Sequence, residues 1–296
     1  MNPLEISGAP VPKRRGRKSK KQTEKELLNE YMAEYDPKAS GKQRKLYENM
    51  QYLSPYEKTA FENRFTQPKN KHQEQYVETL KNKHRKIVVA SGPAGTGKTL
   101  FATEFGVKYF LLGIYEKLIF TRPSVTVDEE LGFLPGTLEE KMAPWVRPIY
   151  DVLYTFLSPR EVQELMEEKI IEIAPLGFMR GRTFKNAWIV ADEMQNSTIS
   201  QMKMLLTRLG DNSRLVITGD LEQNDIVGEI NGMEDFLRKF RGRNSSSISS
   251  FEFDKEDIQR EEVVKEVLDI YSGNNVQNYL DTEPPVIGII PRRQNI

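Results

Sequence analysis

The chain has 296 residues, of which 38% are apolar and 29% are charged, so it can form one large domain or two small ones with an ample core. It contains no cysteine, which excludes disulfides, zinc–thiolate sites and thiol catalysis and fits a reducing cytoplasm. With only two histidines, a histidine-based triad or a histidine-rich metal site is not expected. No apolar run approaches the roughly 20 residues of a membrane span, so we expect a cytoplasmic protein without membrane contact.

The formal net charge is zero, but the charges are unevenly distributed. Residues 1–45 carry 12 Lys or Arg against six Asp or Glu, and seven of the nine residues at positions 13–21 are basic. Such a density attracts the phosphate backbone of nucleic acids, although a solubilising tail is the alternative. Arg15-Gly16-Arg17 also weakly resembles a minor-groove-binding arm that lacks its proline. We predict a disordered basic arm over residues 1–22 and a helical N-terminal extension over residues 23–65.

The strongest motif is Gly92-Pro93-Ala94-Gly95-Thr96-Gly97-Lys98-Thr99, which fits the phosphate-loop pattern G-x-x-x-x-G-K-[ST]. Glycines let the backbone turn tightly and bring its N–H groups against phosphate oxygens. Lys98 would place a positive charge on the β- and γ-phosphates, and Thr99 would offer a hydroxyl to Mg²⁺. We therefore predict that these eight residues bind a nucleoside triphosphate with Mg²⁺.

The surrounding sequence supports the motif, which requires a strand before the loop and a helix after it. Residues 85–90 form a short apolar run, as in a buried parallel strand, and residues 99–112 carry apolar side chains at helical spacing. The alternative is a glycine-rich turn that binds no ligand, and this context disfavours it.

Further along, residues 117–121 read as a second strand and residues 170–173 as a third. Between them we expect a helix from about residue 137 that is interrupted by Pro144 and Pro148, and a second helix over residues 161–168.

A second chemical centre follows the apolar residues 187–191, where a strand ends in Asp192 and Glu193. This is the Walker B pattern, in which Asp192 would hold Mg²⁺ through water and Glu193 would polarise the attacking water. An acidic surface turn is the alternative, but the pair lies 94 residues after Lys98, with predicted strands and helices between them, as the pattern requires.

A third polar turn, at Gly219-Asp220 and Gln223, follows the strand predicted over residues 214–218. The amide of Gln223 could sense the γ-phosphate or the attacking water. Upstream of the phosphate loop, Gln73 could pair with both edges of adenine, because an amide both donates and accepts hydrogen bonds.

For the remaining segments we predict a helix over residues 197–208, a surface loop over 243–250, a strand over 251–253, a helix over 257–271 and an extended tail over 273–296.

Taken together, these motifs resemble the PhoH family over residues 66–272. The elements that carry the resemblance are 92–99, Leu131–Gly136, Arg180-Gly181-Arg182-Thr183-Phe184, Asp192-Glu193-Met194-Gln195-Asn196, Leu206-Thr207-Arg208, and Gly219-Asp220 with Gln223. Residues 1–64 match no part of the family pattern.

The resemblance implies a RecA-like α/β domain with a mostly parallel sheet, similar to the first domain of superfamily 1 helicases. PhoH-like proteins are phosphate-starvation-associated ATPases of bacteria and of many bacteriophages, so ATP, Mg²⁺ and nucleic-acid-related work are implied, with a ring such as a hexamer as one form of homo-oligomer. Carried over by position, the family's adenine-side glutamine corresponds to Gln73. Arg208 closes a family element and would stabilise charge on the γ-phosphate, from this chain or from a neighbouring subunit, with Arg182 and Arg260 as rivals.

The sequence leaves three uses of ATP open. We favour an oligomeric ATPase that moves or remodels RNA or single-stranded DNA, because the chain has no room for the second lobe of a helicase. The alternative is an ATP-gated switch that binds a partner protein through the N-terminal extension without motor activity. A phosphate-loop kinase is weaker, since no acceptor-binding or lid segment is apparent.

Overall fold

The computed structural model describes residues 54–123, 138–225 and 230–259, together with four helical positions, Val263, Val264, Val267 and Ile270. The predicted basic arm, most of the N-terminal extension, the Leu131–Gly136 element, Arg260 and the C-terminal tail lie outside the described residues. Within the described part of the chain, no helix is both long and apolar enough to cross a membrane.

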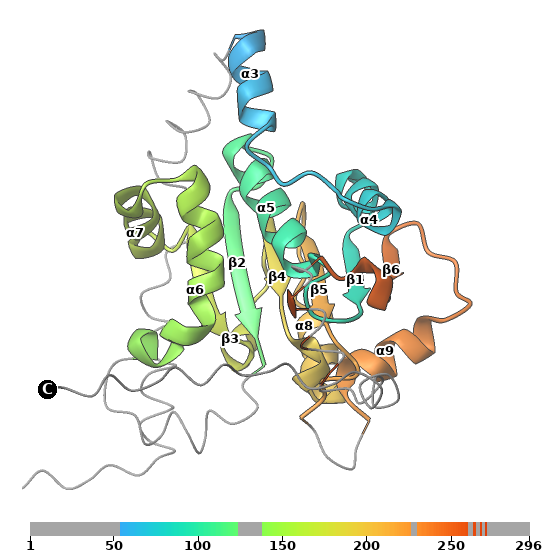
Figure 1. The fold of residues 1–296 in the computed structure, drawn as a ribbon. Coiled ribbons are helices and arrows are strands. Elements are labelled where there is room, and N and C mark those ends of the chain that lie inside the picture. Colours follow the sequence, from blue (N-terminus) through green and yellow to red (C-terminus); the bar gives the residue numbers. More distant parts are fainter. Residues whose placement is uncertain are drawn as a thin grey trace, which may run out of the picture.

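The described residues form a six-stranded sheet in which every neighbouring pair is parallel. The strand order is β3-β2-β4-β5-β1-β6 (Figure 1). This confirms the predicted α/β fold with a parallel sheet. The strands are β1 (Ile87–Ser91), β2 (Lys117–Arg122), β3 (Ile171–Pro175), β4 (Ala187–Ala191), β5 (Arg214–Gly219) and β6 (Ile248–Glu252).

Helices cover both faces of the sheet because alternate strand residues point to opposite sides. Val88 and Ala90 belong to one apolar cluster and Val89 belongs to the other. The first cluster takes its helical residues from α4 (Lys71–Lys81), α5 (Lys98–Leu111), α6 (Leu138–Phe156) and α7 (Pro159–Glu167), and also includes Phe61 of α3 (Pro55–Glu62). The second takes them from the 3₁₀ turns η2 (Leu176–Met179) and η3 (Met194–Asn196), from α8 (Ile199–Leu206) and from α9 (Gly232–Phe240).

Close packing of α5 on β4 fixes the helix that follows the phosphate loop. Trp188 on β4 is fully buried, and its indole N–H donates to the carbonyl of Ala102 at 3.0 Å. A Cβ atom at Gly106 would lie 2.6 Å from the Trp188 ring, so only glycine allows this approach. The helix N-terminus is thereby held over the carboxyl ends of the strands.

The strand order brings the three predicted chemical turns to one edge of the sheet. β5 lies between β1 and β4, and the register pairs Ser91 with Gly219 and Ala191 with Ile217. The phosphate loop, the Asp192 turn and the Gly219 turn therefore leave adjacent strands at their carboxyl ends, where open α/β sheets bind ligands.

Three local predictions were wrong. The helix predicted from residue 257 does not begin there, because Ile258 is extended after the 3₁₀ turn η4 (Lys255–Asp257). The helix α6 runs unbroken through Pro144 and Pro148. An interior proline costs about 3 kcal/mol. In α6, Val146 and Leu153 are buried, and the free energy gained from their burial offsets that cost. The serine-rich loop also ends earlier than predicted, because β6 begins at Ile248 and pairs with β1.

Candidate nucleotide-binding site

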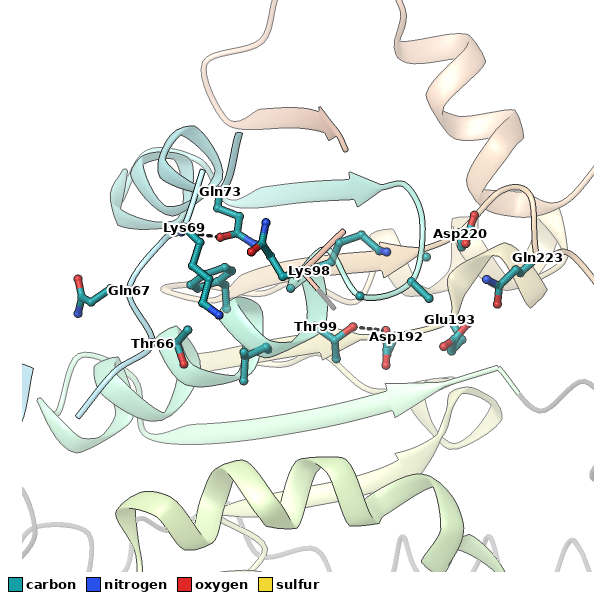
Figure 2. Close-up of a pocket in the computed structure, with 17 residues that line it drawn as sticks. Thr66, Gln67, Lys69, Gln73, Lys98, Thr99, Asp192, Glu193, Asp220 and Gln223 are labelled. Carbon is teal, nitrogen blue, oxygen red and sulfur yellow. Dashed lines mark hydrogen bonds between the residues drawn. The ribbon is translucent and has the colours of Figure 1, made fainter. Parts of the chain in front are cut away.

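A cavity of about 490 Å³ lies at the carboxyl edge of the sheet. Figure 2 shows Lys98 and Thr99 at its centre, with Glu193, Asp220 and Gln223 toward one end and residues before the phosphate loop toward the other. Four predicted positions, Lys98, Asp192, Glu193 and Gln223, thus meet at one cavity although they come from three separate turns. From the remaining predicted set, Gln73, Ala94, Gly95, Gly97 and Thr99 also line it.

The phosphate loop holds a backbone conformation that favours glycine. Gly92, Gly95 and Gly97 have φ values of 134°, 87° and 88°, all in the left-handed region. The hydroxyl of Thr96 donates to the carbonyl of Pro93 at 3.1 Å and closes the loop on itself. The loop is therefore shaped before any ligand arrives, with its N–H groups at the start of α5 available to an anion.

Lys98 is folded back onto the loop it follows. Its ammonium donates to the carbonyls of Gly92 at 2.6 Å and Pro93 at 2.7 Å, and the residue is 7% exposed. Burial lowers the pKa of Lys98, whereas the carboxylates of Asp220, Asp192 and Glu193 raise it. An ammonium whose partners at the cavity are neutral carbonyls is suited to turn toward a negatively charged polyphosphate.

Thr99 and Asp192 are in direct contact at the first turn of α5. The Thr99 hydroxyl donates to Asp192 Oδ1 at 2.8 Å (Figure 2). The Thr218 hydroxyl of β5 donates to the same oxygen at 2.5 Å. A hydroxyl and a carboxylate are oxygen ligands of the kind that Mg²⁺ prefers. The residues present therefore fit a magnesium site between the helix and β4.

Glu193 follows Asp192 in a left-handed conformation, with φ 52° and ψ 37°. This conformation is uncommon for a residue with a side chain and costs of order 1–3 kcal/mol. It turns the chain directly into η3, so that consecutive residues 192 and 193 both line the cavity. The sequence identified both acids but gave no sign of this backbone strain.

A family model described as "PhoH-like protein" matches residues 66–272. The chain belongs to the PhoH family. Relatives include a PhoH-like protein of Bacillus subtilis, 43% identical over 204 residues covering 69% of this chain and 63% of the relative. Another is the protein PhoH of Escherichia coli K12, 38% identical over 219 residues covering 72% and 61%. The shared region thus spans about three fifths of each relative.

This PhoH-family chain carries a phosphate loop whose glycines already hold positive-φ conformations. Among solved structures, a Pif1 helicase from Candida albicans aligns with a TM-score of 0.37 and 15% identity over 70% of this chain and 44% of that one. A likeness at this level carries no argument about function.

Gln73 lies at the other end of the cavity, on α4, with its amide held by backbone groups. Its Oε1 accepts from the N–H of Lys69 at 2.7 Å, and its Nε2 donates to the carbonyl of Thr96 at 3.1 Å. Each amide atom keeps one further hydrogen-bonding position. The glutamine thus ties the segment before α4 to the phosphate loop, and its predicted contact with adenine remains a prediction.

Two of the three candidate arginines do not line the cavity. Arg208 donates to the carbonyls of Met204 and Arg182, both at 3.3 Å, and its own carbonyl accepts from the N–H of Phe184. Phe184 precedes the start of β4, so the length of that strand separates Arg208 from Asp192. Arg182 forms a buried ion pair with Glu172 at 2.8 Å. Arg208 therefore does not line the cavity of its own chain in the described residues, and its predicted role at the γ-phosphate stays a prediction.

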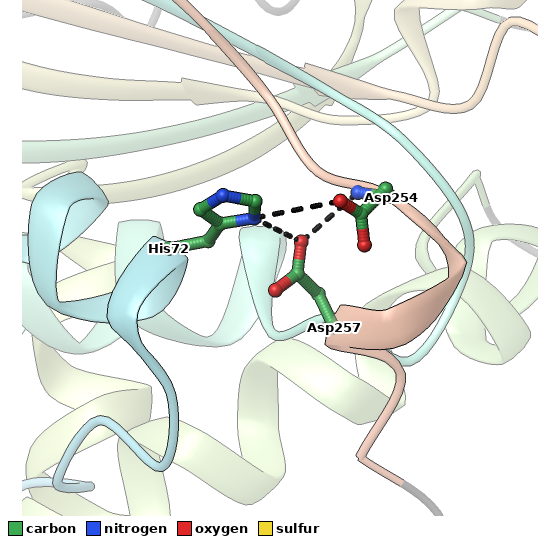
Figure 3. A group of neighbouring side chains, drawn as sticks. All are labelled: His72, Asp254 and Asp257. Carbon is green, nitrogen blue, oxygen red and sulfur yellow. Dashed lines mark hydrogen bonds and ion pairs between the residues drawn. The ribbon is translucent and has the colours of Figure 1, made fainter.

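The segment at residues 253–259, here called the strap, crosses the phosphate loop. The N–H of Phe253 donates to Ser91, and the N–H of Gln259 donates to Gly95 at 3.0 Å. His72 of α4 holds the strap through Asp257, with Nδ1 and Oδ2 2.8 Å apart, while Asp254 lies at 3.8 Å (Figure 3). The ion pair accounts for this cluster, and we assign no metal to it.

Sequence reasoning left two side chains in this region without a role. Asp220 is 6% exposed, lines the cavity and raises the pKa of Lys98. Gln195 is 1% exposed and contacts both acidic turns. Both stand in the motifs that carried the family resemblance, but spacing alone could not show which way their side chains point.

Proposed function

We propose that the chain hydrolyses ATP to ADP and phosphate with Mg²⁺. One observation carries the proposal. A buried ammonium at Lys98, a hydroxyl–carboxylate pair at Thr99 and Asp192, and a second carboxylate at Glu193 line one cavity beside a preformed phosphate loop. This is the set of groups that phosphoryl transfer needs, because such catalysis consists of positioning and charge stabilisation.

Each side chain has a role that follows from its position. The loop N–H groups and Lys98 bind the β- and γ-phosphates, and the negative charge of the phosphates favours the charged form of the ammonium that burial disfavours. Glu193 orients the attacking water and accepts its proton, and Gln223 contacts the γ-phosphate or that water from the opposite turn. When bound at Thr99 and Asp192, Mg²⁺ neutralises charge on the phosphate oxygens.

We further propose that hydrolysis is coupled to RNA or single-stranded DNA in a homo-oligomer. The basic arm offers contacts for a phosphate backbone. Arg208 lies at the opposite end of β4 from Asp192, and this position suits a charge-stabilising arginine that serves a neighbouring subunit. In phosphate-loop enzymes such an arginine is worth about 10³–10⁵-fold in rate, so an isolated subunit hydrolyses ATP slowly.

The deciding experiment measures ATPase rates with RNA, single-stranded DNA, duplex DNA or no nucleic acid, across a range of protein concentrations. The proposal predicts stimulation by a single-stranded nucleic acid and a specific activity that rises with protein concentration. Hydrolysis that responds to neither would favour the ATP-gated switch that binds a partner protein. A chain without Mg²⁺-dependent hydrolysis under any of these conditions would contradict the proposal.

A further inference from the structure

Gln195 is the third residue after the metal-side carboxylate, and its amide joins the two acidic turns. Its Nε2 donates to Glu193 Oε2 at 2.6 Å and to the carbonyl of Gln223 at 3.2 Å. Its Oε1 accepts from the N–H of Asp220 at 3.0 Å. A single buried side chain thus contacts the predicted base and both ends of the turn that carries Gln223.

Chemistry fixes the orientation of this amide. A carboxylate and a carbonyl can only accept hydrogen bonds, and the backbone N–H of Asp220 can only donate one. The reversed amide would lose all three bonds, so oxygen and nitrogen can be assigned without ambiguity. Since Gln195 is 1% exposed, no bulk water can replace these partners.

The surrounding backbone is shaped to admit the amide. A Cβ atom at Gly219 would lie 2.7 Å from Gln195 Oε1, so a larger residue at the end of β5 would displace it. On the other side, the left-handed turn at Glu193 folds η3 so that the side chains of 193 and 195 meet. The neighbouring Asn196 anchors the same turn further on, exchanging two hydrogen bonds of 3.0 Å with Asp225, and neither of these bonds involves Glu193.

We propose that Gln195 is a positioning residue, which holds the Glu193 carboxylate and the Gln223 turn in the relative geometry that in-line attack on the γ-phosphate requires. This inference rests on the proposed ATPase activity. The amide donates to one carboxylate oxygen of Glu193, and Glu193 itself lines the cavity, so this hydrogen bond restricts the orientation of the carboxylate beside the cavity. Loss of Gln195 therefore impairs hydrolysis while nucleotide binding persists.

The test is a double-mutant cycle in the full-length chain, with single-turnover ATP hydrolysis and nucleotide binding measured for each variant. Gln195→Met keeps the side-chain size and removes all three hydrogen bonds. We expect it to lower the hydrolysis rate by about 10²-fold with little change in nucleotide affinity, as a small misplacement of a reacting group does. In the Glu193→Gln background the same change should have a much smaller effect, because one of the two groups that Gln195 positions, the Glu193 carboxylate, is already lost.

Asn196→Ala is the matched control, because it weakens the same turn without touching Glu193. Its effect on the rate should be the same in both backgrounds. If Gln195→Met does not fold, Gln195→Glu takes its place, since it keeps an acceptor for Asp220 but repels Glu193 and should likewise slow hydrolysis chiefly in the wild-type background.

Three results would overturn the inference. They are an unchanged rate in the Gln195 variant, an equal loss in both backgrounds, or a loss explained by weaker nucleotide binding. Each leaves the proposed function standing, provided the wild-type chain hydrolyses ATP. A wild-type chain without hydrolysis would overturn both.

Discussion

At Lys98, burial and function oppose each other. The ammonium is largely removed from water, its pKa is lowered by that burial, and its hydrogen bonds go to two loop carbonyls and, at 3.5 Å, to a threonine hydroxyl. Charged groups in such places usually weaken the folded state, and they are retained for what they bind.

Lys98→Met should therefore leave the unliganded protein at least as stable as the wild type while abolishing nucleotide binding. Thermal unfolding with and without Mg²⁺ and ATP measures both effects. The wild type should melt at a higher temperature with nucleotide, because ligand binds the folded state alone, and the variant should show no shift. A variant that still responds to nucleotide would contradict the role given to Lys98.

The sequence identified the residues that carry the chemistry, but it did not identify the groups that hold their side chains in place. Spacing after a predicted strand was enough to name Lys98, Thr99, Asp192 and Glu193, because each motif restricts the residue type. It could not show that the Gln73 amide is held by Lys69 and Thr96, or that Gln195 joins two turns, because those contacts depend on side-chain direction across the fold.

At the scale of elements, the phosphate loop is supported from outside by the strap. Gly92 has a φ of 134°, and a Cβ atom there would lie 2.4 Å from the carbonyl oxygen of Phe253. The strap bonds to the strand before the loop through Phe253 and to the loop itself through Gln259. Gly92 thus combines a positive φ, which favours glycine, with a close contact to the strap.

Gly92→Ala should lower the free energy of unfolding by more than Gly181→Ala. Both glycines have positive φ, which costs an alanine roughly 1–2 kcal/mol, but a Cβ atom at Gly181 would meet nothing within 4 Å. The difference between the two variants in denaturant titrations reports the clash with the strap together with the greater strain of an alanine at φ 134°. Equal losses would show that the strap can move away at no cost.

The strap is also tied to α4 by His72, whose pKa is raised chiefly by the hydrogen bond to Asp257 and by that carboxylate's charge. Asp254 and Glu256 add to the same effect. A raised pKa means that the tie stabilises fully below the ordinary value of 6.5 and is lost as pH rises through the folded-state value.

His72→Gln should therefore destabilise the protein more at about pH 5.5 than at about pH 8.5, when unfolding is followed in denaturant at both values. His84→Gln, at the other histidine and on an exposed turn, is the control and should show no such difference. A His72 variant whose loss of stability is the same at both pH values would contradict the tie.

Element prediction succeeded where local pattern and tertiary structure agree. The strands before the phosphate loop and before Asp192 were correct, because a buried parallel strand must be apolar on both faces. The break predicted at Pro144 and Pro148 was wrong, because packing of α6 offsets the missing hydrogen bonds. The early start of β6 was missed because Ile248-Ser249-Ser250 has little apolar content and gains its conformation from pairing with β1.

At the scale of the whole molecule, neither of the two candidate arginines within the described residues, Arg182 and Arg208, lines the cavity. Arg208 and Arg182 both lie near the amino ends of the strands, and the cavity lies at the carboxyl ends. A subunit that donates Arg208 to its neighbour would resolve this arrangement, and it would make hydrolysis depend on assembly.

Mixing variants tests donation between subunits. Arg208→Ala and Lys98→Met should each be inactive alone, the first for lack of the arginine and the second for lack of binding. In mixed assemblies, a Lys98→Met subunit supplies Arg208 to the intact site of an Arg208→Ala neighbour, so activity should return. Mixtures that stay inactive, although they assemble, would exclude Arg208 as the donated residue.

The most direct test of the nucleotide site compares binding and hydrolysis in Glu193→Gln. This variant keeps a side chain of the same shape and loses only the charge that accepts a proton from water. With Mg²⁺ and ATP, it should bind nucleotide as tightly as the wild type and hydrolyse it at least about 10²-fold more slowly in a single turnover. Wild-type turnover in this variant would contradict the account of the site.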